Sequence, residues 1–279
     1  MKPFIKWAGG KTQLLEEINK RIDTSKKFYY EPFVGGGSSF LNALENYDFQ
    51  EYHINDINGN LINVYQKLKD NFPFLYLELS KINSEFERFS SEKEKTLYYY
   101  EKRNEYNVGI NNRDPRNAAL FIFLNKTCFN GLYRTNLKGE FNTAFGKYEN
   151  FSFDIFNLKE IHNAMNEKKV FIHNKQFYDL DIKEDLFVYM DPPYRPVTKG
   201  GFVRYNNKPF TEENQIQLSE YCKYLSDKNC KILVSNSFTR DGFYEKYYEG
   251  FEIEKVFANR RINCDANKRG KILEVMIHN

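Results

Sequence analysis

The amino-acid sequence predicts an α/β protein with a doubly wound sheet and an inserted, mostly helical second domain. Residues 1–70 alternate between strand and helix patterns, as the opening of a doubly wound sheet does. Residues 151–279 return to this alternation after a block, 71–150, in which helical patterns dominate. We therefore expect 1–70 and 151–279 to form one domain and 71–150 to form another.

In the opening segment, apolar residues at helical spacing alternate with short strand patterns. The expected elements are a helix over 11–18, a strand over 28–30, a helix from Ser38 to Leu44, a strand over 51–55 and a helix over 61–68. Three glycines, Gly35 to Gly37, follow the first strand, and Asp56 follows the second. We expect Ser38 and Ser39 to cap the helix after the glycines.

The later elements are predicted in the same way. The inserted block has a long helical pattern over 74–106, a helix over 117–125 and a hairpin that turns at Lys138 and Gly139. Beyond it we expect strands near 169–173, 186–190, 231–235, 251–257 and 272–277, with helices near 157–166 and 212–226.

Composition excludes several classes of protein. With 41% hydrophobic and 28% charged residues, the chain has the usage of a globular protein, not of a disordered or fibrous one. The net charge of +3 is too small to indicate a polyanionic partner by itself. No apolar run approaches the roughly 20 residues of a membrane span, and the first residues lack a signal-peptide core. We expect a cytoplasmic protein without a membrane segment.

Cysteines and histidines do not form a recognisable pattern. The four cysteines lie far apart with no C-x-x-C pair, and the four histidines are equally scattered along the sequence. We therefore expect no disulfide framework, no metal site and no cysteine nucleophile.

The first motif that carries chemistry is Asp191-Pro192-Pro193-Tyr194, directly after an apolar strand pattern. Ligands of open α/β sheets bind at the carboxyl ends of strands. The two prolines lack N–H donors and leave carbonyls that only accept. Asp191 and the Pro192 carbonyl can therefore receive a substrate amino group, and Tyr194 offers a face for an aromatic ring. The alternative is a strand-ending turn whose tyrosine packs in the core.

The second motif is the glycine turn of residues 31–37 (Glu-Pro-Phe-Val-Gly-Gly-Gly). Glycines after a first strand let a ligand approach the backbone, and the next helix offers free N–H groups. Asp56, at the end of the next strand, stands where an acid binds ribose hydroxyls. Together they predict a nucleoside ligand, although a tight turn and a capping aspartate would explain each alone. Phe40 stands where a dinucleotide fingerprint needs its last glycine.

The third motif, residues 4–12, ends in Gly-Lys-Thr but is not a P-loop, because Ile5 stands where that motif needs a glycine. Trp7, the single tryptophan, and the two lysines beside the glycines instead suggest the lip of a ligand site. The alternative reading makes Trp7 a core anchor.

These motifs, in this order, resemble the Dam-type adenine DNA methyltransferases, and the resemblance covers nearly the whole chain. It rests on residues 6–11 (Lys-Trp-Ala-Gly-Gly-Lys), 31–37, 55–58 (Asn-Asp-Ile-Asn), 129–136 (Phe-Asn-Gly-Leu-Tyr-Arg-Thr-Asn), 139–142 (Gly-Glu-Phe-Asn), 145–148 (Phe-Gly-Lys-Tyr) and 191–194. The resemblance implies a Rossmann-like methyltransferase sheet, S-adenosylmethionine as the cofactor and double-stranded DNA as the partner. It is compatible with a restriction endonuclease of the same site as a second partner.

The resemblance also implies which residues do what. Those that would bind S-adenosylmethionine are Trp7, Lys11, Phe33, Gly35, Gly36, Gly37, Asp56, Phe177 and Asp191. Asp56 would bind the ribose and Phe177 the adenine, although Lys175 and Gln176 replace the residues usual before that aromatic. Residues 191–194 would bind the target adenine after it leaves the helix, and its amino group would attack the methyl group directly.

A recognition element over residues 117–148 would contact the DNA. Phe129 would wedge into the duplex, and Asn130, Leu132 and Arg134 would read bases, Arg134 through a planar fork that suits guanine. Lys6, Asn136, Lys147 and Tyr148 complete the expected DNA contacts, with Lys6 on a guanine. A salt bridge to Glu140 is the structural alternative for Arg134.

Two further features bear on the target. Thr143 and Ala144 stand where relatives that read a G-A-T start usually have Val-Pro, so GATC is the expected but not the only target. Residues 255–271 hold six basic side chains against one acid, which is typical of phosphate contacts or of a solvated loop. RNA adenine, cytosine N4 and a catalytically idle DNA-binding relative remain as alternatives.

Overall fold

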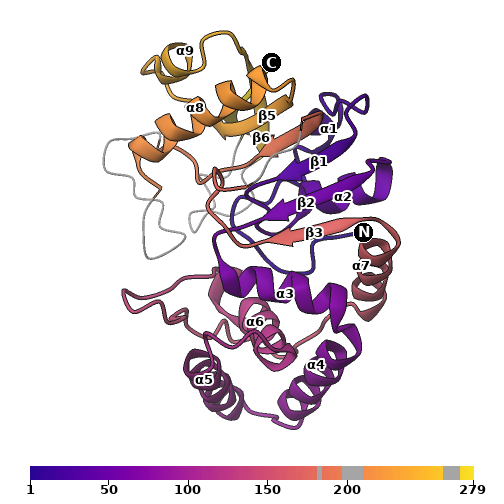
Figure 1. Ribbon diagram of the computed structural model, residues 1–279. Helices are drawn as coiled ribbons and strands as arrows, with labels where there is room; N and C mark the ends of the chain where they lie inside the picture. The colour runs from indigo at the N-terminus through magenta and orange to yellow at the C-terminus, as the bar shows by residue number, and fades with distance from the viewer. Residues whose placement is uncertain (181–183, 197–209, 260–270) are drawn as a thin grey trace.

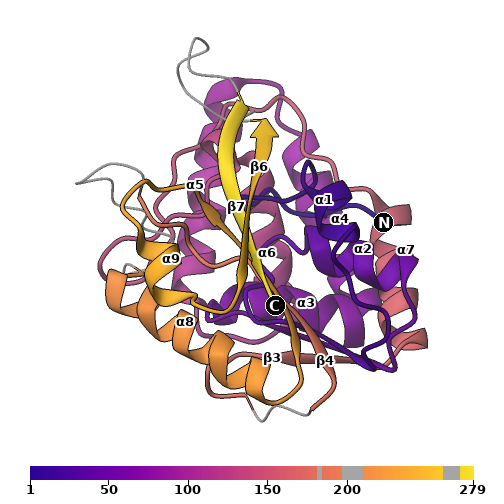
Figure 2. The same ribbon diagram turned by 90° about the horizontal axis from the view of Figure 1, so that it is seen from above.

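The computed structural model describes residues 1–180, 184–196, 210–259 and 271–279, and a seven-stranded sheet runs through its centre (Figure 1). The strand order is β3 (Val170–His173), β2 (Glu51–Asn55), β1 (Phe28–Glu31), β4 (Leu186–Met190), β5 (Lys231–Ser237), β7 (Lys271–His278), β6 (Glu252–Asn259). Strands β1 to β5 are parallel, and β7 pairs antiparallel with both β5 and β6. Figure 2 shows β6 and β7 side by side from above. This arrangement confirms the predicted α/β class.

The strand order changes direction between β1 and β4, and this change is the switch point of the sheet. From β1 the chain moves outward to β2 and β3, and it then returns to β4 beside β1 and continues to β5. Phe28 of β1 pairs with Leu186 of β4. Successive connections leave in opposite directions at this point, so a crevice is expected outside the carboxyl ends of β1 and β4.

Helices cover both faces of the sheet. The helices α1 (Leu15–Asn19), α2 (Ser38–Asn46), α3 (Gly59–Asp70) and α7 (Ile155–Glu167) share one core, and α8 (Glu212–Asp227) and α9 (Phe243–Tyr247) share the other. Successive side chains of a strand point to opposite faces of the sheet, and in β4 they enter the two cores in turn. Phe187 and Tyr189 belong to the first core, and Leu186 and Val188 belong to the second. Every residue of β4 is buried, which explains its continuous apolar sequence.

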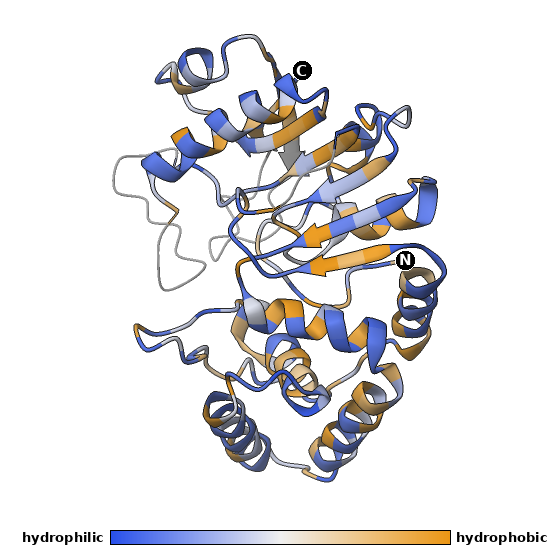
Figure 3. Ribbon diagram, viewed as in Figure 1, coloured by the Kyte–Doolittle hydropathy of each residue, from blue (hydrophilic) through white to orange (hydrophobic). Residues whose placement is uncertain are grey.

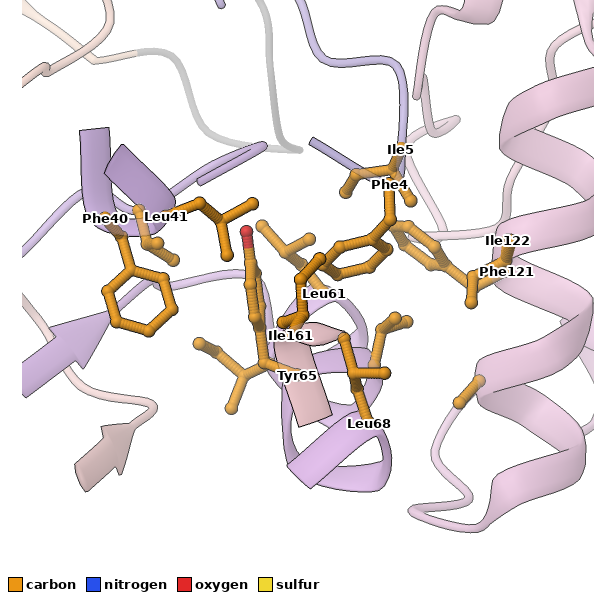
Figure 4. Close-up of a cluster of buried hydrophobic side chains, with 14 of the residues drawn as sticks. Phe4, Ile5, Phe40, Leu41, Leu61, Tyr65, Leu68, Phe121, Ile122 and Ile161 are labelled. Atoms are coloured by element: carbon orange, nitrogen blue, oxygen red, sulfur yellow. The ribbon is translucent and has the colours of Figure 1, made fainter. Parts of the chain in front are cut away.

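The inserted block contributes α4 (Phe72–Glu87), α5 (Glu92–Val108) and α6 (Pro115–Thr127), which lie below α3 in Figure 1. Figure 3 shows α5 coloured largely hydrophilic, whereas α6 is buried along most of its length. Phe4 lies in the core that α3 and α6 share and meets the Tyr65 ring edge-on at 5.3 Å (Figure 4). One hydrophobic core therefore runs from the sheet into the block, and the division into two domains stays a prediction.

Several predicted elements differ from those observed. The helix expected over 11–18 begins only at Leu15, because the preceding residues form turns that carry Lys11 into the cavity described below. The single pattern over 74–106 is two helices, and the second begins after Ser91, whose side chain forms a capping box with Glu94. Gly37, in a left-handed conformation, is the N-cap of α2, so the expected serine caps are wrong.

The expected hairpin is not a regular one. Between residues 128 and 150, all of them described, the only β-pairing consists of two isolated antiparallel bridges, Cys128 with Phe145 and Thr135 with Phe141. The turn does lie at Gly139, which has φ +83° and donates to the Asn136 carbonyl. The other predicted strands and helices occur within two residues of their expected bounds. The short helix α9 and the 3-10 helix η1 (Phe129–Gly131) were not predicted.

Candidate active site

A cavity of about 1060 Å³ opens at the switch point, outside the carboxyl ends of β1 and β4. Its lining includes every residue that the resemblance assigns to a cofactor or to the target base: Trp7, Lys11, Phe33, Gly35, Gly36, Gly37, Asp56, Phe177, Asp191, Pro192, Pro193 and Tyr194. These residues come from five separate stretches of the chain. The cavity also reaches the inserted block, through Tyr133 and Thr135.

The glycine turn between β1 and α2 packs tightly against two aromatic side chains. Gly35 has φ +47° and Gly37 has φ +75°, which glycine adopts without strain. A Cβ atom on Gly35 or Gly36 would lie 2.8 Å from the Trp7 side chain, and one on Gly37 would lie 2.4 Å from the Tyr65 hydroxyl. That hydroxyl donates to the Gly35 carbonyl at 2.9 Å. The turn therefore depends on the absence of side chains.

Gly37→Ala is expected to destabilise the protein more than Gly242→Ala does. The two glycines have similar φ values, +75° and +73°, but no atom lies within 4 Å of a Cβ on Gly242. Both variants incur backbone strain of about 1–2 kcal/mol, and only Gly37→Ala adds overpacking of about 1–3 kcal/mol. Thermal or urea unfolding of the two variants measures the difference, and equal destabilisation would contradict the packing account.

Trp7 combines the two roles considered for it. It is half-buried, it lines the cavity, and it stacks on Tyr133 at 5.7 Å between ring centroids. Tyr133 in turn stacks on Phe121 of α6 at 5.0 Å. An aromatic stack thus connects the glycine turn with the inserted block, and the role of Tyr133 was not foreseen from the sequence.

Asp56 is oriented by the backbone around it. Its Oδ2 accepts from the Gly35 amide at 3.1 Å and its Oδ1 from the Asn58 amide at 2.9 Å. Burial raises the pKa of Asp56 to about 6, and these two bonds oppose that rise. The carboxylate is therefore held in one orientation at the edge of the cavity.

Asn55, just before Asp56, links three of the segments that line the cavity. Its side chain is buried, donates to the Pro32 and Lys175 carbonyls at 3.0 Å each, and accepts from the Lys175 amide at 2.9 Å. These bonds fix the segment that carries Phe177. The Phe177 ring lies 5.3 Å from that of Phe33, and the two rings form an apolar wall.

Asp191 forms an ion pair with Lys11 inside the cavity. The Lys11 ammonium lies 2.8 Å from Asp191 Oδ1, donates to the Gly9 carbonyl, and stands 4.6 Å from the centre of the Tyr194 ring. Burial raises the pKa of Asp191 to about 6, and the Lys11 charge opposes this rise. Glu31, buried beside them, accepts from the Tyr29 hydroxyl, and burial raises its pKa well above the usual value.

The backbone after Asp191 is held by buried polar groups that the sequence analysis did not identify. Gln215 of α8 donates to the Pro193 carbonyl at 2.7 Å and accepts from Asn236 of β5 at 3.0 Å. The Asn236 side chain accepts from the Arg195 amide at 3.0 Å. Arg195 itself pairs with Asp241, which lowers the pKa of that carboxyl to about 2.

The residues expected to read bases lie on the surface of the inserted block. Phe129, Asn130, Leu132 and Arg134 are exposed, Phe129 with 56% of its surface accessible. Asn130 has φ +57°, which turns the chain sharply between the exposed side chains. Arg134 donates to Asn142 at 3.0 Å, and no ion pair with Glu140 forms within this described segment.

The remaining predicted DNA contacts have partners within the protein. Lys6 donates to the Tyr148 hydroxyl at 2.9 Å, and Lys147 pairs with Glu92 at 2.7 Å. The Asn136 side chain accepts from the Lys138 and Glu140 amides and so builds the turn at Gly139. Most of the basic stretch 255–271 lies outside the described residues, and the Lys255 ammonium lies 4.6 Å from the Phe238 ring centre.

Other side chains that bear on the chemistry lie away from the cavity. The four histidines are less scattered than expected, because His53 Nδ1 lies 3.1 Å from His173 Nε2. In the described part, one cluster could hold a cation, Glu252, Glu254 and His278, but Arg21 already pairs with Glu254. Cys128 and Cys222 are buried free thiols. No described helix is long and apolar enough to cross a membrane.

Comparison with known proteins agrees with this geometry. A family model described as D12 class N6 adenine-specific DNA methyltransferase matches residues 7–262. The Type II methyltransferase M.MjaIII of Methanocaldococcus jannaschii is 41% identical, over 100% of this chain and 99% of its own length. The DNA adenine methylase of Escherichia coli K12 is 34% identical, over 99% of this chain and 94% of its own. The DNA N-6-adenine-methyltransferase of Escherichia phage P1 is 32% identical, over 99% of this chain but 35% of its own length.

Proposed function

Because this chain belongs to the D12 class N6 adenine-specific DNA methyltransferases, we propose that its cavity binds S-adenosylmethionine and receives an adenine from double-stranded DNA. The observation that carries the proposal is that Asp56 and the glycine turn share one cavity with residues 191–194. A nucleoside site and an acceptor site for an amino group thereby face each other.

The residues present fit S-adenosylmethionine. Asp56 offers an oriented carboxylate to the two ribose hydroxyls, and Phe33 and Phe177 offer an apolar wall to the adenine ring. Lys11 is one of the cations that line the cavity, and it would pair with the carboxylate of the methionine part. When bound, the cofactor supplies an electrophilic methyl group on a sulfonium.

The residues 191–194 orient the target amino group. Asp191 and the Pro192 carbonyl accept its two N–H bonds, which draws the nitrogen lone pair out of conjugation with the ring and towards the methyl group. Tyr194 stacks on the adenine. Lys11 occupies the position beside Asp191 Oδ1 that the amino group needs, so the ammonium has to move when the base enters. Catalysis then consists of orientation and electrostatic stabilisation, without a covalent intermediate.

The exposed loop of the inserted block is the proposed reader of the DNA, and 71–150 is the proposed recognition domain. Extraction of the adenine costs a few kcal/mol of unstacking, which Phe129 offsets by entering the duplex. Arg134, Leu132 and Asn130 read the bases, and Lys6 contacts a guanine. We propose GATC as the target. Thr143 donates to the Leu132 carbonyl at 2.7 Å, so this residue, together with the exposed Ala144, shapes the reading surface.

The activity should fall as the pH drops through about 6. Asp191 must be ionised to accept the amino group, and its pKa of about 6 predicts that kcat/KM is full above that pH and lost below it. Lys11→Met removes the charge that holds this pKa down, so its acid limb should move to higher pH. Rates at saturating cofactor between about pH 5 and pH 9 test this. A limb near the ordinary pKa of aspartic acid in both proteins would contradict it.

The experiment that tests the proposed function is sequencing that detects methyladenine, on DNA from a methylation-free host that expresses this protein. Methyladenine confined to GATC supports enzyme, product and target together. A different motif would retain the chemistry and attribute the change to Thr143 and Ala144. No methyladenine from a folded protein would reject the proposal and favour RNA adenine, cytosine N4 or an idle DNA-binding protein.

Restriction is a further part of the proposal. Two relatives carry the name Type II methyltransferase, and such enzymes protect DNA from an endonuclease of the same specificity. Digestion of the methylated DNA by endonucleases that GATC methylation blocks would show whether this protein can give that protection.

A further inference from the structure

We propose that Glu274 is a positioning residue for the methyl transfer, because it fixes and polarises the ring of Tyr194. The inference rests on the proposed function, in which Tyr194 stacks on the target adenine. Glu274 lies in β7, opposite Ser237 of β5, with only 9% of its surface accessible. The Tyr194 hydroxyl donates to Glu274 Oε2 at 2.6 Å, and both residues line the cavity.

The hydrogen bond to Glu274 limits the freedom of the Tyr194 ring. Gln215 holds the Pro193 carbonyl and Asn236 holds the Arg195 amide, so the backbone on both sides of Tyr194 is fixed. These bonds leave the side-chain torsions of Tyr194 free. The bond to Glu274 restrains the far end of the side chain from a different strand. A stacked base that must point its amino group at one methyl group needs this restraint, because small displacements of reacting atoms slow a reaction steeply.

The same hydrogen bond places a carboxylate beside the Tyr194 ring. A carboxylate that accepts from a phenol is a charge-assisted partner, and it increases the electron density of the phenol ring. Burial, with Asp191 and Glu274 nearby, keeps the pKa of Tyr194 well above its usual value, so the hydroxyl remains a donor. The face of this ring already attracts a cation, since the Lys11 ammonium lies 4.6 Å from its centre. As the amino nitrogen bonds to the methyl group, the bond from that group to sulfur would break, and the nitrogen would carry positive charge until one N–H proton leaves to Asp191 or water. The same face of the ring would stabilise that charge.

The chain offers a matched control for a purely structural role. The Tyr98 hydroxyl donates to Glu85 Oε2 at 2.7 Å, between α5 and α4 and away from the cavity. Glu85→Ala therefore removes a bond of the same type from a place where no reacting group lies. It also removes the ion pair of Glu85 with Lys102 at 3.4 Å. Any effect that follows from loss of a tyrosine–glutamate bond alone should appear in both variants.

The experiment compares Glu274→Ala, Glu274→Gln, Tyr194→Phe and the double variant Tyr194→Phe/Glu274→Ala with Glu85→Ala. A hydrogen bond to a charged group contributes enough for about a ten- to hundredfold loss in kcat for Glu274→Ala. Glu274→Gln keeps an acceptor and should lose less. In the Tyr194→Phe background, Glu274→Ala should lower kcat further by less than about threefold. Calorimetry should find the cofactor Kd of all variants unchanged within about threefold. Glu85→Ala should keep the kcat of the parent enzyme when DNA is saturating.

A second measurement separates positioning from folding. The Glu274 charge lies close enough to raise the pKa of Asp191, so Glu274→Gln should shift the acid limb of kcat/KM to lower pH. A melting temperature lowered by a structural change would not produce that shift. A fluorescent 2-aminopurine at the target position should also show a less ordered environment in Glu274→Ala than in the parent enzyme.

Three results would overturn the inference. Full kcat in Glu274→Ala, additive losses in the double variant, or an equal loss in Glu85→Ala each leave Glu274 without a role in positioning. These outcomes all require a parent enzyme that methylates adenine, so they leave the proposed function intact. A folded parent enzyme that transfers no methyl group to adenine would reject both proposals. If Glu274→Ala does not fold, Glu274→Gln and Tyr194→Phe decide the question.

Discussion

Replacement of Asp191 by alanine is expected to abolish methyl transfer even when the cofactor is saturating. The variant removes one of the two proposed acceptors for the target amino group. Loss of one preorganised hydrogen-bond partner lowers kcat by about 10²–10³-fold in other enzymes, and saturation with DNA or cofactor should not restore the rate. Single-turnover incorporation of labelled methyl groups into duplex DNA measures the loss.

A second variant separates this chemical effect from a structural one. Asp191→Ala leaves the buried Lys11 ammonium without its carboxylate at 2.8 Å, which destabilises a protein by a few kcal/mol. The double variant Asp191→Ala/Lys11→Met removes both charges and should recover much of the melting temperature without recovering turnover. If turnover returned together with stability, the assignment of Asp191 to the reaction would be wrong.

Asp56→Ala is expected to weaken cofactor binding by about 10- to 100-fold, since two bonds from ribose hydroxyls to one carboxylate are lost. In contrast with the Asp191 variant, high cofactor concentrations should restore most of the rate. Titration calorimetry gives the Kd directly. Asp56→Asn is the matched control, because its side chain keeps one oxygen that can accept from the Gly35 or Asn58 amide. Its Kd for the cofactor should lie between those of the parent enzyme and of Asp56→Ala. An unchanged Kd for Asp56→Ala would remove the residue from the site.

Much of the cavity could be predicted because its signals are local in the sequence. Strand β4 reads as an unbroken apolar run that ends at Asp191, and the glycine turn and Asp56 each follow a strand directly. Parallel strands place such residues at one edge of the sheet, so their meeting follows from the fold class alone. The assignment of roles, by contrast, came from the resemblance and not from the spacing.

The residues that support the site could not be predicted because their partners are distant in sequence. Glu274 follows Tyr194 by 80 positions, and it reaches the tyrosine only because β7 pairs antiparallel with β5. Nothing in the sequence pattern of β7 indicates that this strand pairs with β5. Helix propensity was likewise overruled at residues 11–14, where Lys11 has to reach Asp191. The break before α5, by contrast, could have been predicted from the sequence, because Ser91 and Glu94 have the spacing of a capping box.

The pairing of β1 with β4 also constrains how the protein is made. Phe28 of β1 pairs with Leu186 of β4, which is synthesised much later. More than half of the chain must therefore leave the ribosome before these two central strands can pair. At about 5–20 residues per second this delay is on the order of ten seconds. During it, one side of β1 presents unpaired backbone to other nascent chains. Recombinant yield should therefore depend on chaperone supply and growth temperature more than on the stability of the finished enzyme.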